Sequence, residues 1–147
     1  MEERLGRLMA MTGKVAREHF DRSLSAVGSS LNTYVVLRTV ANCPAVSQRQ
    51  LASALGIEGP TLTHHLDRLA SDGLIERVRN PSDRRVSYVE LTPAGRAHLD
   101  RVEAYAEIQD KEFRSMFTPD EAATLVELLT RIRDRYTEEA DVHNPAR

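Results

Sequence analysis

Apolar residues recur every three or four positions along most of the chain, which is the spacing of amphipathic helices. Within residues 58–72, Leu62, Leu66 and Leu69 form one apolar stripe, and Pro60 takes the first helical position. Gly73 is expected to end this helix. The residues beside the stripe are polar and rich in hydrogen-bond donors, namely Thr61, Thr63, His64, His65 and Arg68. Such a face suits a groove lined with hydrogen-bonding edges and phosphates.

A second short helix is predicted just before it, between Ser47 and Gly56. Ser47 followed three residues later by Gln50 forms a capping box, and Leu51 and Leu55 give the helix an apolar face. The four residues that join the two helices begin and end with glycine. Two short helices joined in this way are typical of a helix-turn-helix.

A basic β-hairpin is predicted after the second helix. Residues 74–79 and 84–92 have strand-like patterns, and residues 80–83 between them are Asn, Pro, Ser and Asp, which favour turns. Four arginines and one aspartate between Arg77 and Arg85 give the hairpin about three positive charges near its tip. A helix-turn-helix followed by a basic hairpin predicts a winged helix, in a fold that is mainly α with a small β-hairpin.

Long amphipathic helices flank this winged helix, which we assign to residues 31–96. The flanking parts are residues 1–27 and 97–140. Outside the helix-turn-helix, helices are expected over residues 2–27, 31–41, 93–116 and 119–140. The end helices either pack on their own winged helix or form a dimer interface. We favour the dimer, because a two-fold assembly doubles the contacts with a palindrome whose half-sites lie about one turn, ~34 Å, apart.

The order of these motifs from Leu51 to Arg96 resembles that of the MarR (multiple antibiotic resistance regulator) family. Matching elements include Asp72-Gly-Leu-Ile-Glu-Arg77 and Leu91-Thr-Pro-Ala-Gly-Arg96, and Gly56-Ile-Glu-Gly-Pro-Thr-Leu62 is most similar to the SlyA-like branch. The resemblance implies one MarR-type domain over residues 1–147. It also implies a homodimeric repressor that binds a pseudo-palindromic operator in double-stranded DNA, with the recognition helix in the major groove and the wing in the minor groove.

The resemblance also assigns roles in the wing. Asp83 and Arg85 match the family's Asp-x-Arg element, so Arg85 would enter the minor groove and Asp83 would orient it, with Arg84 beside them. On the recognition helix, His64 stands where relatives often have arginine. A neutral histidine offers one donor and one acceptor instead of a bidentate fork, so the base recognised at that position should differ.

A small-molecule effector is a further implication of the resemblance. The family's pocket lies between the winged helix and the dimerisation helices and often takes aromatic or phenolic anions. Candidate lining residues are Arg17, His19, Tyr34 and Arg38. Ordinary hydrogen bonding at the interface is the alternative role for each of them.

The net charge of −2 argues by itself against a partner that is a polyanion. Its distribution changes that conclusion, because residues 1–46 carry +2, residues 47–96 carry +1 and residues 97–147 carry −5. The acidity therefore lies in the C-terminal helices, and a local basic wing matters more for phosphate binding than the total.

Other function classes find little support in the sequence. No nucleophile elbow, phosphate loop or paired acid–base site is present, so neither an enzyme nor a cofactor is predicted. A metal site at His64, His65 and Asp67 is disfavoured because adjacent helical residues point about 100° apart. The single Cys43 could sense oxidants but is more simply a small buried hydrophobe. A redox- or metal-responsive sensor and a winged helix that binds proteins remain the alternatives.

The location expected from the sequence is the cytoplasm. The N-terminal residues lack the apolar core of a signal peptide, and no stretch reaches membrane-spanning length. One cysteine also rules out an internal disulfide framework.

Overall fold

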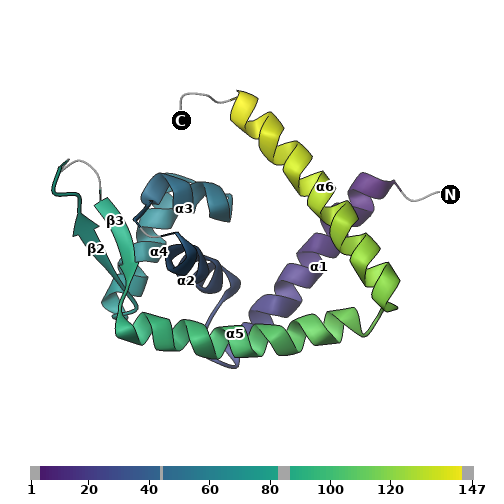
Figure 1. Cartoon of the computed structure of the whole chain (residues 1–147), viewed down its shortest axis with the longest axis horizontal. Helices are drawn as coiled ribbons and strands as arrows, with labels where there is room; N and C mark the ends of the chain where they lie inside the picture. The colour runs from purple at the N-terminus through teal and green to yellow at the C-terminus, as the bar shows by residue number, and fades with distance from the viewer. Residues whose placement is uncertain (1–3, 44, 83–86, 144–147) are drawn as a thin grey trace. The chain divides into compact units, whose positions relative to one another are not determined.

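The computed structural model describes residues 4–43, 45–82 and 87–143, with side chains as far as residue 136 (Figure 1). Helices and strands follow in the order α1 (Leu5–Ser25), α2 (Leu31–Asn42), β1 (Val46–Ser47), α3 (Gln48–Leu55), α4 (Gly59–Ser71), β2 (Ile75–Arg79), β3 (Ser87–Leu91), α5 (Pro93–Arg114) and α6 (Pro119–His143). The chain forms two compact units, residues 1–106 and residues 107–147, and the boundary falls within α5. The predicted mainly helical fold with a small antiparallel sheet is confirmed.

The sheet has one strand more than the predicted hairpin. Its order is β1-β3-β2, and both pairs are antiparallel. Val89 of β3 lies opposite Val46 on one side and Arg77 on the other. The prediction missed β1 because it is two residues long and Ser47 is at once a strand residue and the N-cap of α3. This short strand ties the start of the helix-turn-helix to the wing.

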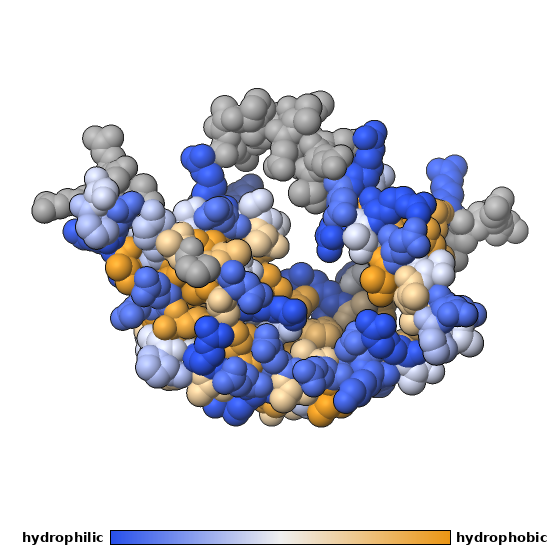
Figure 2. Space-filling view, viewed as in Figure 1, coloured by the Kyte–Doolittle hydropathy of each residue, from blue (hydrophilic) through white to orange (hydrophobic). Residues whose placement is uncertain are grey.

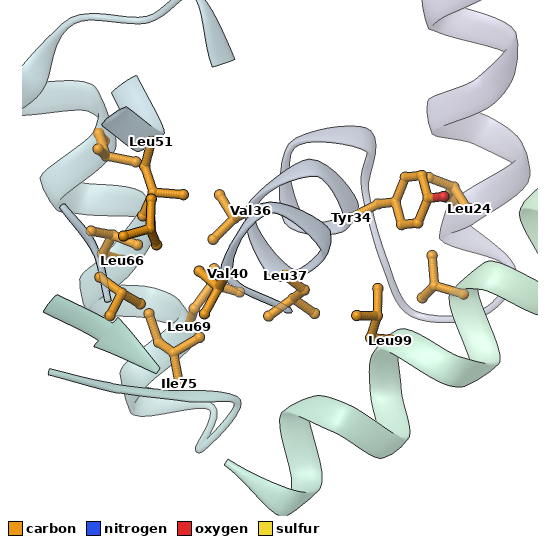
Figure 3. Packing of buried hydrophobic residues seen from close by; sticks show 14 residues of the cluster. Leu24, Tyr34, Val36, Leu37, Val40, Leu51, Leu66, Leu69, Ile75 and Leu99 are labelled. Carbon is orange, nitrogen blue, oxygen red and sulfur yellow. The ribbon is translucent and has the colours of Figure 1, made fainter. Parts of the chain in front are cut away.

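α2 is the central helix of the first unit, since it contacts α1, α3 and β3. Figure 3 shows side chains of α2 directed both toward the helix-turn-helix and toward Leu24 of α1 and Leu99 of α5. The core cluster consists of Leu24, Tyr34, Val36, Leu37, Val40, Val46, Leu51, Leu62, Leu66, Leu69, Ile75, Val89, Leu99 and Val102. Burial on this scale fixes the helix-turn-helix on α2.

The ends of the two short helices follow the predicted local chemistry. Both halves of the capping box between Ser47 and Gln50 form at the start of α3. Gly56 and Gly73 adopt φ of 63° and 72°, the left-handed conformation in which glycine is favoured after a helix. One detail differs, because α4 begins at Gly59 and Pro60 is therefore its second residue, not its first. Pro60 fits there because the second N–H of a helix also has no intrahelical partner.

A tight junction joins the base of the wing to α5. The Thr92 hydroxyl donates to the Gly73 carbonyl at 2.5 Å and accepts from the Gly95 N–H at 2.9 Å. The Thr92 N–H donates to the Leu74 carbonyl at 3.2 Å. A Cβ atom on Gly95 would lie 1.9 Å from that same Leu74 oxygen. The Thr-Pro-Ala-Gly motif thus starts α5 and fixes its first turn against the segment that joins α4 to β2.

The second unit contains the last part of α5 and the whole of α6. A capping box begins α6, since Thr118 and Glu121 exchange hydrogen bonds at 2.8 Å and 3.3 Å. Within the described part of the chain, no helix combines the length and the apolar character needed to cross a membrane.

Many apolar side chains of the end helices are exposed to solvent, and Figure 2 shows hydrophobic residues in orange at the surface among hydrophilic ones in blue. On α1 they follow helical spacing, which gives one stripe. The exposed apolar residues of α1 are Leu5, Leu8, Met11 and Val15, and those of the second unit are Ile108, Met116, Phe117, Leu125, Val126, Leu128, Leu129 and Tyr136. These surfaces are far more apolar than a helix in water requires.

Candidate nucleic-acid interface

One side of α4 is anchored in the core of the first unit. Leu62, Leu66 and Leu69 are 1%, 0% and 2% exposed. Because these residues recur at four- and three-residue steps, they define the buried stripe that the sequence predicted. The helix is therefore held rigidly, and the remaining side chains are fixed in direction by it.

The opposite side of α4 presents a line of polar residues to solvent. Thr61, His64 and Arg68 are all exposed and are spaced by three and four residues, so they follow one another along the helix surface. Together they offer a hydroxyl, an imidazole and a guanidinium. These groups can donate to base edges and to phosphate oxygens.

Thr63 lies on the flank of this line and also makes a hydrogen bond within α4. Its hydroxyl donates to the Gly59 carbonyl at 3.0 Å, one turn back along α4. The hydroxyl proton is therefore used within the helix. Thr63 is exposed and keeps its oxygen lone pairs as acceptors.

The same flank joins α4 to the wing through an ion pair. The Asp67 carboxylate lies 2.7 Å from Arg77 Nη1 of β2, and the two side chains are 57% and 33% exposed. A pair this exposed contributes about 0.2–1 kcal/mol. It neutralises Arg77, one of the four arginines of the basic hairpin. It also links β2, the first strand of the wing, to α4.

The other flank of α4 faces α2 through His65, which is half-buried. His65 Nε2 lies 3.1 Å from Nδ2 of Asn32, a residue in the first turn of α2. Burial lowers the pKa of His65 below 6.5, and the positive charges of Arg68 and His64 lower it further. The lowered pKa favours the neutral form of this ring, which lies between two helices, while its neighbours on the exposed line face solvent.

The start of the wing turn is built around Asn80. Its side-chain oxygen accepts from the Ser82 N–H at 2.9 Å, and its Nδ2 donates to the Tyr88 hydroxyl at 3.0 Å. The first contact is an Asx turn, which is the turn chemistry expected of Asn. Asp83, Arg84 and Arg85 lie outside the described residues, so their roles stay predictions.

Of the four candidate effector residues, the structure brings two together. Arg38 Nη1 donates to the Tyr34 hydroxyl at 2.5 Å, and the guanidinium carbon lies 5.7 Å from the centre of the Tyr34 ring. Arg17 donates to the Asn32 side-chain oxygen at 2.6 Å, and His19 is half-buried on α1. All four residues remain candidates for effector binding.

The structure also bears on the alternative sites. In the parts of the chain that the structure describes, no three His, Cys, Asp or Glu side chains gather closely enough to hold a metal ion. Cys43 is exposed just after α2, so its interpretation as a buried hydrophobe is wrong. Its position at a helix end, where chain geometry and not the apolar pattern sets exposure, explains the error.

Two contacts of α4 have no signal in the sequence. Asn32 contacts a residue 33 positions away, and Asp67 was considered only as a metal ligand although it pairs with a residue of the wing. No short motif signals either contact. The apolar stripe of α4 could have indicated that Asp67 lies on the flank nearest the hairpin, but it could not identify the partner.

Comparison with known proteins identifies the family. A family model described as MarR family matches residues 30–87, which include α3, α4 and most of the wing. A protein of Thauera aromatica named as a transcriptional regulatory protein for the hcr operon is 32% identical over 122 residues, covering 82% of this chain and 74% of the relative.

Solved structures agree with that match over most of their length. The transcriptional repressor CouR, bound to a 23-mer DNA duplex, is 28% identical with a TM-score of 0.83, covering 88% of this chain and 92% of CouR. BpsR of Bordetella bronchiseptica, whose DNA binding is regulated by 6-hydroxynicotinic acid, is 26% identical with a TM-score of 0.81, covering 90% and 94%. The chain belongs to the MarR family of transcription regulators.

Proposed function

We propose that the chain forms a homodimer that binds a pseudo-palindromic operator in double-stranded DNA and represses transcription by occluding a promoter. The observation that carries this proposal is the geometry of α4. Its line of Thr61, His64 and Arg68 is exposed, while the opposite stripe is buried in the core. This arrangement is what a helix needs in order to enter a major groove as a rigid element. The role is one of binding and not of catalysis.

Within this proposal, His64 and Arg68 are the residues of α4 that distinguish bases. Thr61 lies in the first turn of the helix and contacts phosphate or a base edge from there. Thr63 accepts a hydrogen bond, because its own proton is held by Gly59. Arg84 and Arg85 of the wing, with Asp83 orienting Arg85, add contacts in the minor groove. His65 supports the helix from the side of α2.

The homodimer is proposed to use the exposed apolar surfaces of α1 and of the second unit. Leu5, Val15 and Tyr136 are 70%, 63% and 66% exposed, although they belong to apolar stripes. Exposed apolar patches of this kind mark interaction surfaces in soluble proteins. A second copy of the chain is the simplest cover, and residues 1–27 and 97–140 are the proposed dimerisation segments. They flank the winged helix of residues 31–96.

Release by a small effector is the second element of the proposal. BpsR shows that a related regulator responds to an aromatic acid. In this chain, Tyr34 and Arg38 pair an aromatic ring with a cation, which suits an aromatic anion, and Arg17 and His19 are the further candidates. If such a ligand prefers the DNA-free dimer, it must weaken DNA binding by the same factor. The SlyA-like branch stays a prediction that rests on residues 56–62.

The experiment is a titration of the protein against a DNA fragment from upstream of its own gene. Salt is varied, and random DNA serves as competitor. We expect binding that survives the competitor and weakens steeply with salt, because lysines and arginines release counterions from phosphates. Binding no tighter than to random DNA would contradict operator recognition at this site. A selection of bound fragments from the whole genome would then separate a distant operator from a winged helix that binds proteins.

A further inference from the structure

A chain of polar contacts connects α1 to the recognition helix. Arg17 of α1 donates to the side-chain oxygen of Asn32 at 2.6 Å, and Nδ2 of Asn32 lies 3.1 Å from Nε2 of His65. On the far side of the ring, Arg68 Nη2 lies 3.5 Å from His65 Nδ1. Three helices of the first unit are therefore linked through one amide and one imidazole.

The chemistry of arginine fixes the orientation of the Asn32 amide. A guanidinium has only donors, so the atom 2.6 Å from Arg17 must be the amide oxygen. The amide nitrogen then faces His65 and donates to it. Nε2 of His65 must consequently be the acceptor, which places the hydrogen of the neutral ring on Nδ1.

This tautomer determines whether Arg68 can donate a hydrogen bond to His65. A neutral imidazole has a single acceptor, and both Asn32 and Arg68 direct donors at the ring. Asn32 donates to that acceptor at the shorter distance. The 3.5 Å contact between Arg68 Nη2 and His65 Nδ1 therefore joins two N–H donors and is not a hydrogen bond. Arg68 gains little from the ring. Its guanidinium stays available for an acceptor outside the protein.

We propose that Asn32 is a positioning residue for DNA recognition, which assigns the acceptor of His65 to α2 and thereby leaves Arg68 free for the operator. The inference rests on the proposed function, because it assumes that α4 is the DNA-binding helix. Without the Asn32 donor, the ring moves its hydrogen to Nε2 and accepts from Arg68 at Nδ1. Arg68 is then held along α4 and lost to DNA.

Arg17 takes part because it keeps the amide from turning over. If Arg17 is withdrawn, the Asn32 side chain can rotate by half a turn and present its oxygen to the ring, which favours the other tautomer. The position of α1 is tied to the same region, since Asp21 Oδ1 accepts from the Leu31 N–H at 2.7 Å. A displacement of α1 would therefore reach Arg68 through two side chains.

The first test is the tautomer of His65 in the DNA-free protein, observed by NMR of the ¹⁵N-labelled imidazole. The wild-type ring should carry its hydrogen on Nδ1. In Asn32→Asp, the carboxylate accepts from Arg17 and from the ring, so the hydrogen should appear on Nε2. A wild-type ring with hydrogen on Nε2, or a spectrum unchanged by Asn32→Asp, would overturn the proposal. Thermal unfolding of both proteins verifies that each is folded.

The second test is DNA affinity, with Asn32→Ala as the variant that adds no charge. Losing one hydrogen-bonding arrangement should weaken operator binding about 2- to 10-fold. The same substitution in an Arg68→Gln background should have no further effect, because Arg68 is the group through which Asn32 acts. Arg17→Met should weaken binding in the same direction by a smaller factor.

The outcomes separate this inference from the function on which it rests. Wild-type protein that fails to recognise the operator contradicts the proposed function and the inference together. If wild type recognises the operator and Asn32→Ala binds it with the same affinity, only the positioning role is contradicted. Equal losses for Asn32→Ala in the wild-type and Arg68→Gln backgrounds would also overturn it, since the effect would then be merely structural.

Discussion

The winged part of the chain and its helical ends have the same apolar spacing, but their apolar side chains differ in exposure. In α4 the stripe residues are at most 2% exposed, whereas Leu5 of α1 and Tyr136 of α6 are 70% and 66% exposed. The winged part has a sheet, α2 and the start of α5 to cover its helices. Among the described residues of the helical ends, by contrast, many apolar side chains are exposed. A three- and four-residue spacing therefore predicts a helix and its apolar face, and it does not predict what covers that face.

The largest effect should come from a cavity in the winged part. Leu66→Ala removes a fully buried side chain and should lower the free energy of unfolding by about 2–5 kcal/mol. Denaturant titration at several protein concentrations measures this loss, which should be the same at each. A loss below about 1 kcal/mol would mean that α4 is not anchored as described.

The matching change in the ends should act through assembly. Leu128→Glu places a charge on an apolar surface that is 44% exposed in the single chain, so the fold of one chain should survive. If a second copy covers this surface, the unpaired charge should cost about 3 kcal/mol and raise the dimer Kd roughly a hundredfold. Sedimentation over a range of concentrations gives the Kd. An unchanged dimer Kd in both Leu128→Glu and Leu129→Glu would show that α6 does not lie in the dimer interface.

Two glycines offer a smaller contrast between the regions. Gly95→Ala places a Cβ atom 1.9 Å from the Leu74 oxygen, so α5 or the backbone at Leu74 must shift, at a cost of about 1–3 kcal/mol. Gly13→Ala in α1 meets no atom within 4 Å and should stabilise the helix by about 0.5–1 kcal/mol. Thermal unfolding of the two variants should move in opposite directions. Equal shifts would contradict the tight junction at Thr92.

The DNA-binding residues should differ in kind between α4 and the wing. His64→Ala should alter preference at one base position by about 1–3 kcal/mol, because a groove contact is lost. Arg85→Ala should weaken binding to all sequences alike and reduce the salt slope by about one. Affinity for a set of single-base operator variants measures both. An Arg85→Ala protein with unchanged affinity and salt slope would refute the proposed wing contact.

The smallest effects should be those of pH on stability. The two units should lose stability in different pH ranges. Burial and Arg101 lower the pKa of the nearly buried His98 below 6.5, so its stabilising effect is complete above pH 6.5 and is lost as pH falls through the folded-state pKa. Hydrogen bonds from Thr118 lower the pKa of Glu121 below 4.5, so the stability it adds to α6 is lost only in stronger acid.

Unfolding of full-length variants between pH 7 and 3.5 tests this order. His98→Gln should flatten the stability profile in the higher part of that range, and Glu121→Gln only in the lower part. His65 adds to the first effect with the same sign, because its folded-state pKa is lowered too. A His98→Gln protein that loses stability as steeply as wild type below pH 6.5 would contradict the assignment.

The parts of the fold that sequence could predict are those set by neighbours. The capping boxes at Ser47 and Thr118 and the helix end at Gly73 depend on residues at most four positions apart, and all three are present. The fold class followed from the same local patterns. The stripe of α4 was also correct, because its spacing alone separates a buried side from an exposed one.

The parts that could not be predicted depend on contacts between distant residues. Nothing near β1 indicates that Val46 pairs with Val89, and nothing near Asn32 indicates His65. The pairing of Asp67 with Arg77 changed the charge available on the wing. In physical terms, these contacts are made by packing of whole elements, so they become visible only once the helices and strands are placed.

The central claim is that one chain completes a winged helix while two chains complete a DNA-binding protein. Hydroxyl-radical footprinting on the operator, with the mass of the complex measured in the same buffer, tests it most directly. We expect two copies on the DNA and two protected half-sites about one turn, ~34 Å, apart. One copy protecting a single segment would contradict it.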